Sequence, residues 1–126
     1  MKAEVAQAVS EIETCFPSVT VTAEDDGDGG AVVTMYPLDP GSVYVQRETW
    51  MKFAISYLYP DADVYPLFVR PDLARADNNG HGEGIALGKF QGEPALQLSR
   101  RSNRRDPAFD TAARKVAKVL KWLRAQ

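Results

Sequence analysis

Two amphipathic helical patterns lie at opposite ends of this chain, and the text between them is strand-like or irregular. In the first pattern, apolar residues recur at spacings of four, three and four, which predicts a helix over 2–16 with Val5, Val9, Ile12 and Phe16 on one face. In the second, the spacing predicts a long helix over 107–125 with Phe109, Ala113, Val116, Leu120 and Leu123 on one face. Asp106 followed by Pro107 predicts its start, because Asp caps helices and Pro suits the first helical position.

Alternating apolar residues between these helices predict strands. Residues 18–38 are typical of a hairpin whose turn is the Gly- and Asp-rich stretch 25–30. One or two further strands are expected in residues 42–60, where Met51, Phe53, Ile55 and Tyr57 form the set that could face the core. "IALGKF" and "ALQLS", on either side of "QGEP", predict a last hairpin. We predict one α+β domain over 1–126: an N-terminal helix, an antiparallel meander of about four strands, and a long C-terminal helix packed on the sheet.

Two stretches are predicted to lie outside regular structure. In "YLYPDADVYPLFVRP" the prolines recur at short intervals, and because proline cannot donate to a sheet we expect an extended or turning path there. The following "DLARADNNGHGEG" is polar and glycine-rich, which indicates an exposed loop. It lacks the Gly-Lys-Ser/Thr ending of a phosphate-binding loop.

Composition excludes several classes of protein. No apolar run approaches the roughly 18 residues of a membrane span, and the acidic N-terminus does not resemble a signal peptide. The only cysteine, Cys15, allows no internal disulfide and no cysteine-based metal cage. It lies beside the first apolar stripe, where a buried structural role is expected. We predict a cytoplasmic protein with no cofactor and no bound metal.

Charge is unevenly distributed along the chain. Residues 100–126 hold nine Lys and Arg against two Asp, a net +7, whereas residues 1–99 hold six against fifteen acidic residues, a net −9. The basic segment is consistent with a surface for an acidic protein or a nucleic acid. Alternatively, the two parts of the chain neutralise each other within one fold. The segment "SRRSNRR" contains no aromatic residue to stack on bases.

Three local patterns in this order resemble the ubiquitin-conjugating enzyme (UBC) fold and its relatives. "FAISYLYPDADVYPLFVRPDL" is similar to the family's strand followed by its Tyr-Pro-rich turn. "NNGHGEG" stands where the family has a His-Pro-Asn motif, and "PALQLSRRSNRRDPAFDTAARKVAKVL" resembles its cysteine strand, loop and Ser-Pro helix start. The resemblance is to a bacterial branch encoded with a ubiquitin-like protein, an activating enzyme and a deubiquitinase-like metalloprotease in antiphage operons.

The resemblance implies the positions of a transfer site. It places Ala95 at the position of the catalytic cysteine, with Ala86 a poorer candidate because it lies far upstream of Pro107. His81 matches the motif histidine, but Gly82 and Glu83 follow it, so only Asn79 could stand in for the family's asparagine. His81 is open to other interpretations: a metal ligand or base, or a residue that stabilises its loop through a hydrogen bond.

An alanine cannot form a thioester, so the chain as written is expected to be inactive in transthiolation. Whether Ala95 is natural or replaces a cysteine is open. Nearby cations would raise the thiolate fraction of a cysteine or hold an acidic partner, and Arg100, Arg101, Arg104 and Arg105 are the candidates.

The expected function is therefore that of a UBC-like protein that carries or positions a ubiquitin-like protein received from an activating enzyme. One alternative is a non-catalytic UBC-like scaffold that binds a protein partner. A further alternative is a nucleic-acid-binding module that uses the basic C-terminal segment.

Overall fold

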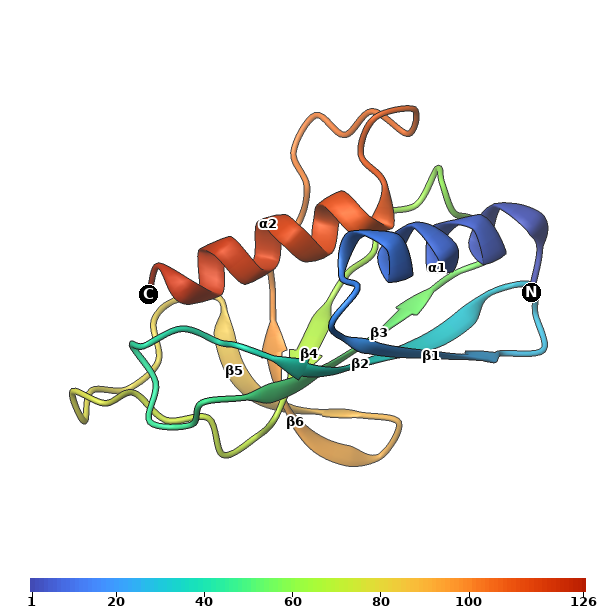
Figure 1. The fold of residues 1–126 in the computed structure, drawn as a ribbon. Coiled ribbons are helices and arrows are strands. Elements are labelled where there is room, and N and C mark those ends of the chain that lie inside the picture. The colour runs from blue at the N-terminus through green and yellow to red at the C-terminus, as the bar shows by residue number, and fades with distance from the viewer.

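The computed structural model describes residues 1–126 as two helices on one face of a six-stranded antiparallel sheet (Figure 1). The helices are α1 (Ala3–Cys15) and α2 (Ala112–Arg124). The strands are β1 (Thr20–Asp25), β2 (Ala31–Leu38), β3 (Thr49–Ile55), β4 (Leu67–Val69), β5 (Ile85–Phe90) and β6 (Glu93–Leu98). No helix is long and apolar enough to cross a membrane.

The sheet has the order β1-β2-β3-β4-β6-β5. The first four strands form a meander, after which the chain runs through a long irregular segment to the far edge of the sheet and enters β5. The β5–β6 hairpin then returns the chain, so that β6 lies between β5 and β4. Residues 99–111 connect the end of β6 to the start of α2, and this loop projects beyond the helix layer (Figure 1).

One hydrophobic core fills the space between the helices and the sheet. From α1 it receives Val5, Ala8 and Ile12, and from α2 it receives Val116, Leu120 and Leu123. Alternate residues of β2 and β3, among them Met35, Met51, Phe53 and Ile55, are completely buried beneath them. The apolar residues that recur every 3.6 positions in the helices and every two positions in these strands therefore pack together in one layer.

The predicted four-strand meander with a long C-terminal helix is wrong, although the protein is α+β. The strand β4 was missed because prolines flank it. Leu67–Val69 lies between Pro66 and Pro71, and all three residues of β4 are buried and pair with β6, while Phe68 and Val69 also pair with β3. The prolines bound this strand instead of preventing its pairing, since proline is tolerated just outside a strand.

The helix expected over 107–125 begins later and is shorter. Asp106 caps a single turn, in which its side chain accepts a hydrogen bond from Ala108 N at 2.9 Å. The helix begins after Thr111, whose Oγ1 accepts a hydrogen bond from Arg114 N at 3.2 Å. Phe109, expected on the apolar face, is therefore outside the helix and exposed. Asp106 and Thr111 thus each cap a turn, but only the turn after Thr111 continues into a helix with a buried apolar face.

Two smaller expectations also fail. Tyr57 is 55% exposed because β3 ends at Ile55, so the alternation that buries Met51 and Phe53 stops before it. Cys15 is exposed, since it lines the open groove between α1 and α2 instead of the underside of α1.

Candidate functional site

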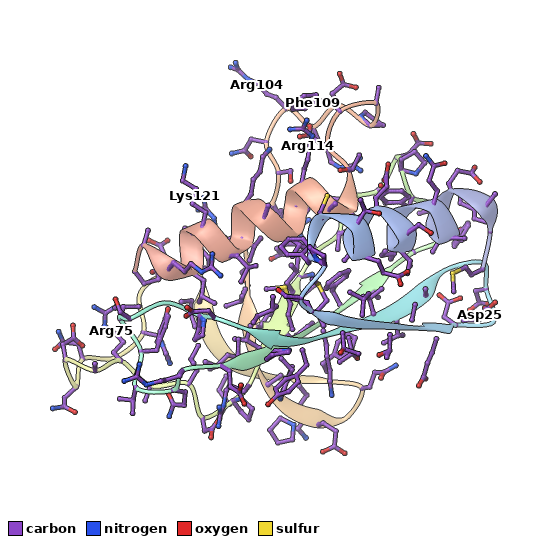
Figure 2. The ribbon with its side chains drawn as sticks, viewed as in Figure 1. Asp25, Arg75, Arg104, Phe109, Arg114 and Lys121 are labelled. Carbon is purple, nitrogen blue, oxygen red and sulfur yellow. The ribbon has the colours of Figure 1, made fainter.

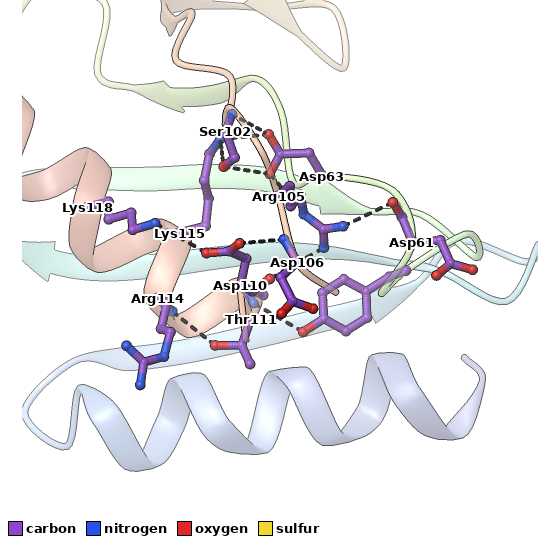
Figure 3. A network of polar contacts seen from close by, with 12 residues as sticks. Asp61, Asp63, Ser102, Arg105, Asp106, Asp110, Thr111, Arg114, Lys115 and Lys118 are labelled. Carbon is purple, nitrogen blue, oxygen red and sulfur yellow. Dashed lines mark hydrogen bonds and ion pairs between the residues drawn. The ribbon is translucent and has the colours of Figure 1, made fainter. Parts of the chain in front are cut away.

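The basic segment that follows β6 is anchored to the protein by one carboxylate, Asp63, from the proline-rich stretch before β4 (Figure 3). Asp63 accepts hydrogen bonds from the backbone N of Ser102 at 2.9 Å and from its hydroxyl at 3.2 Å. It also forms an ion pair with Lys115 at 2.9 Å and a longer one with Arg105 at 3.7 Å. One side chain thus holds the loop and α2 together.

Lys115 is the only cation of the chain that is buried, with 6% of its residue surface exposed. Its Nζ donates to Asp63 at 2.9 Å, to the Ser102 hydroxyl at 3.1 Å and to the carbonyl oxygen of Arg100. An ammonium group has three protons, so these three acceptors satisfy it completely. A buried lysine without such partners would be strongly unfavourable, which is why this network determines the position of the loop.

Burial alone would raise the pKa of Asp63, because it penalises the charged form. The hydrogen bonds and the charge of Lys115, together with the bonds from Ser102, outweigh that effect, and the pKa of Asp63 lies below its usual range. Asp63 is therefore ionised at neutral pH and is neutralised by its own ion pairs.

A second set of contacts holds the turn before α2. The Asp110 carboxylate accepts a hydrogen bond from Asp106 N at 2.7 Å and pairs with Lys118 at 3.2 Å. The hydroxyl of Tyr59 accepts a hydrogen bond from Ala112 N at 3.1 Å at the start of the helix. The loop is thus tied to the fold at both of its ends.

Between these ties, the loop and the adjacent part of α2 expose cations that have no carboxylate partner. We call this surface the arginine face; it consists of Arg100, Arg101, Arg104, Arg114 and Lys121. Figure 2 shows Arg104, Arg114 and Lys121 projecting from the loop and from the outer side of α2. A pocket beside it is lined by cations and neutral residues only: Arg100, Arg101, Ser102, Asn103, Lys115, Lys118 and Val119. This surface is suited to an anionic partner.

Three arginines of this face lie over aromatic rings; one of them is Arg114, whose guanidinium is 4.0 Å from the ring centroid of Phe109. The guanidinium of Arg100 lies 5.1 Å from the ring centroid of Trp122, and that of Arg101 lies 4.0 Å from the ring centroid of Tyr65. Stacking orients a guanidinium while its N–H donors remain available at its edge, and this fork matches a carboxylate. The rings themselves have one side occupied, which leaves less of them for stacking on bases.

Mutual neutralisation explains only part of the charge asymmetry. Of the nine cations in residues 100–126, Arg105, Lys115 and Lys118 form ion pairs with carboxylates. The only carboxylate that residues 1–99 contribute to these pairs is Asp63. Most of the acidic residues therefore do not offset the charge of the basic segment at short range.

The two alanines considered for the cysteine position differ in accessibility. Ala95 is completely buried in β6, where it pairs with Gly88 of β5. Ala86 is exposed on β5, at the edge of the sheet. A thiol at position 95 would be out of reach of a partner, because its side chain points into packed surroundings, whereas a thiol at position 86 would be accessible.

His81 and Asn79 lie in the irregular segment between β4 and β5, and their hydrogen bonds remain within that segment. His81 Nε2 lies 2.7 Å from the carbonyl oxygen of Leu73, the loop-stabilising hydrogen bond considered from the sequence. Asn79 N donates to Asp77, which forms an ion pair with Arg75 at 2.8 Å. Neither residue hydrogen bonds to β5 or to β6, the strand that carries Ala95.

The arginines predicted as binding residues divide into two groups. Arg100, Arg101 and Arg104 are exposed, whereas Arg105 turns toward Asp63 and donates to the carbonyl oxygen of Asp61 at 3.0 Å. Sequence reasoning missed the residues that organise the face: Asp63, Tyr65, Lys115 and Trp122. A weak signal for Lys115 exists, because it is four residues before Val119 and adjoins the apolar stripe of α2.

No known protein family, curated protein or solved structure matches this chain.

Proposed function

We propose that this chain is a non-catalytic, protein-binding domain whose arginine face binds an acidic surface of a partner protein. The observation that carries the proposal is the set of exposed arginines that are stacked on aromatic rings and free of carboxylates. Charge-assisted pairs between arginine and carboxylate are among the stronger polar contacts in proteins. The arrangement supports recognition, and the Ser102 hydroxyl in the loop is held by Asp63 and Lys115.

The resemblance to UBC proteins is consistent with such a role. A UBC-like scaffold that positions a ubiquitin-like protein or its activating enzyme needs a binding surface but no acyl-accepting cysteine. The proposed partner is therefore an acidic protein of a bacterial ubiquitin-like conjugation system, met in the cytoplasm.

Retention on immobilised polyglutamate tests the binding role. We expect the wild-type protein to be retained at low salt and released as salt screens the contact. The double variant Arg100→Glu/Arg101→Glu should lose retention, whereas Arg47→Glu/Lys52→Glu, which has the same net charge, should keep it. Equal loss in both variants would mean that only the total charge matters, and the arginine face would not be a site.

A DNA duplex serves as the competing probe. If a short duplex binds more tightly than polyglutamate at equal salt, with affinity that falls steeply as salt rises, the nucleic-acid alternative replaces the proposal. The stacked positions of Arg100 and Arg101 favour the acidic protein, because their rings are partly covered.

The exposure of Ala86 supports a second candidate function, acyl transfer from position 86 in an active relative. In a Cys15→Ser background, Ala86→Cys should react rapidly with a thiol reagent, and Ala95→Cys only after unfolding. Incubation with a co-encoded activating enzyme and ubiquitin-like protein should then give a reductant-sensitive adduct with Ala86→Cys only. The absence of an adduct would leave the scaffold as the function, and an adduct with Ala95→Cys would contradict the argument from burial.

A further inference from the structure

The strand β5 forms an open edge of the sheet, because it pairs with β6 alone. The hairpin turn consists of Gln91 and Gly92, both with positive φ, and the flanking pair is Phe90 with Glu93. A two-residue turn of this kind makes the flanking pair a hydrogen-bonded one, and hydrogen-bonded pairs then alternate along the ladder. The backbone N–H and C=O groups of Leu87 and Lys89 therefore point away from β6, toward solvent.

This edge also carries an apolar side chain that nothing covers. Leu87 is 73% exposed, the highest value among the large hydrophobic residues of the protein. Its neighbour across the ladder, Leu96, is buried. An additional strand on β5 would pack its own side chain on Leu87 and so extend the apolar layer of the sheet.

The beginning of β5 adjoins the arginine face. Ser99 N donates to the carbonyl oxygen of Gly84 at 2.8 Å, and a Cβ at Gly84 would lie 3.2 Å from the Trp122 ring. Arg100 stacks over that same ring. The start of β5 therefore lies beside a free guanidinium, and its other end carries Lys89. Figure 1 shows β5 beginning below the C-terminal part of α2.

The opposite edge of the sheet, β1, is negatively charged at its end. β1 ends in Glu24 and Asp25 and leads into a turn with Asp26 and Asp28. An acidic segment would be repelled there and attracted at β5, so charge complementarity selects one edge of the two.

From these observations we infer that an extended, acidic segment of the partner protein adds to the sheet as a strand beside β5. This inference rests on the proposed function, since the acidic residues of the segment are those that the arginine face binds. All neighbouring strands of this sheet are antiparallel, and antiparallel pairing is slightly more stable per residue. The added strand is accordingly antiparallel, with its acidic C-terminal end beside Arg100, in the manner of strand addition by peptides.

A fluorescent probe peptide of sequence Val-Thr-Val-Thr-Val-Glu-Glu-Glu tests the inference. Two N-methylated isomers are compared with it, one methylated at the first two valines and the other at the two threonines. Alternate backbone N–H groups of a strand point to opposite sides, so only one of the two methylated sets can point toward β5. The isomer methylated at that set should bind about tenfold more weakly than the parent peptide, and the other isomer should bind as the parent does. Equal binding of both isomers, or equal loss in both, would overturn the inference.

Variants of the protein give an independent readout. Leu87→Pro removes the outward-facing N–H of β5 without removing a hydrogen bond to β6. This variant should bind the probe peptide about tenfold more weakly than the wild-type protein and should be retained on polyglutamate as the wild-type protein is. Amide hydrogen exchange of Leu87 and Lys89 should slow when the probe peptide is added. Unchanged exchange at both amides would contradict strand addition even if the peptide binds.

Failure of this inference is distinguishable from failure of the proposed function. The protein could be retained on polyglutamate through the arginine face while the Val-Thr half of the probe peptide adds nothing to the affinity of that peptide. In that case the proposed function stands and the strand addition is wrong. If neither polyglutamate nor the probe peptide binds, both are wrong.

Discussion

Lys115 and Arg101 belong to the same basic segment, but the fold uses their charges in opposite ways. Lys115 is buried and donates to three acceptors, and its charge is matched by Asp63. Arg101 is exposed and stacked on Tyr65, and no carboxylate contacts it. The difference shows that one charge cluster can serve both stability and recognition, and that burial separates the two uses. Each of the following predictions tests this separation.

The largest expected effect is on the buried side of the comparison. Lys115→Met should lower the free energy of unfolding by about 3 kcal/mol, because it leaves Asp63 and its loop without their main partner. The matched control is Lys118→Met at the exposed pair with Asp110, where a loss of at most about 1 kcal/mol is expected. Urea denaturation monitored by Trp fluorescence measures both. Similar losses in the two variants would show that burial of Lys115 has no special importance.

The second-largest effect is expected in the pH dependence of the free energy of unfolding, through Asp63. Its pKa is lowered in the folded protein, so its contribution is present above the pKa of the unfolded chain and is lost as pH falls through the folded value. Asp63→Asn should therefore be less stable than wild type at neutral pH, and the difference should shrink as pH falls below about 4. Asp28→Asn, at an exposed carboxylate without an ion pair, serves as the control and should follow the wild-type curve. A difference that is independent of pH would contradict the ion pair.

On the exposed side, charge reversal should affect binding but hardly affect stability. Arg100→Glu/Arg101→Glu should change the free energy of unfolding by no more than about 2 kcal/mol, because each residue contributes one exposed cation–π contact. The same variant should no longer be retained on polyglutamate. Thermal unfolding and retention measured on one preparation test this; a large loss of stability would make the two arginines structural.

The smallest effect concerns the stacking geometry. Arg100→Lys/Arg101→Lys keeps both charges but removes the planar donors, so retention on polyglutamate should shift to slightly lower salt with stability unchanged. Arg104→Lys is the control: it also loses planar donors but no stacking contact, because Arg104 has no aromatic partner, so its shift should be smaller than that of the double variant. If the control shifts as much as the double variant, stacking does not orient these side chains for binding.

Much of the fold could be predicted from periodicity. The apolar faces of both helices, the turn at 25–30 and the buried alternation of Met51, Phe53 and Ile55 are local patterns that need no partner to be recognised. The strand β4 was missed because it has only three residues between prolines, and such a short strand depends on pairing with β3 and β6. The helix start was wrong because Asp106 and Thr111 are both suitable caps, and packing of the following residues decides between them.

The candidate site was predicted less well. The exposed arginines were found as a cluster of charge, which is visible in the sequence. The burial of Ala95 was not, because strands on both sides of β6 determine it. Asp63 lies far from Lys115 in sequence, so no local pattern connects them.

The sequence alone determined which segments are amphipathic, which of the longer segments are strand-forming, and that the C-terminal segment carries excess positive charge, since these properties belong to residues and their spacing. The tertiary structure alone decided which cations are neutralised, which alanine is accessible, and which sheet edge stays open. Those properties depend on distances between residues that are remote in the chain, and the strength of an electrostatic or hydrogen-bonding contact is set by distance and burial.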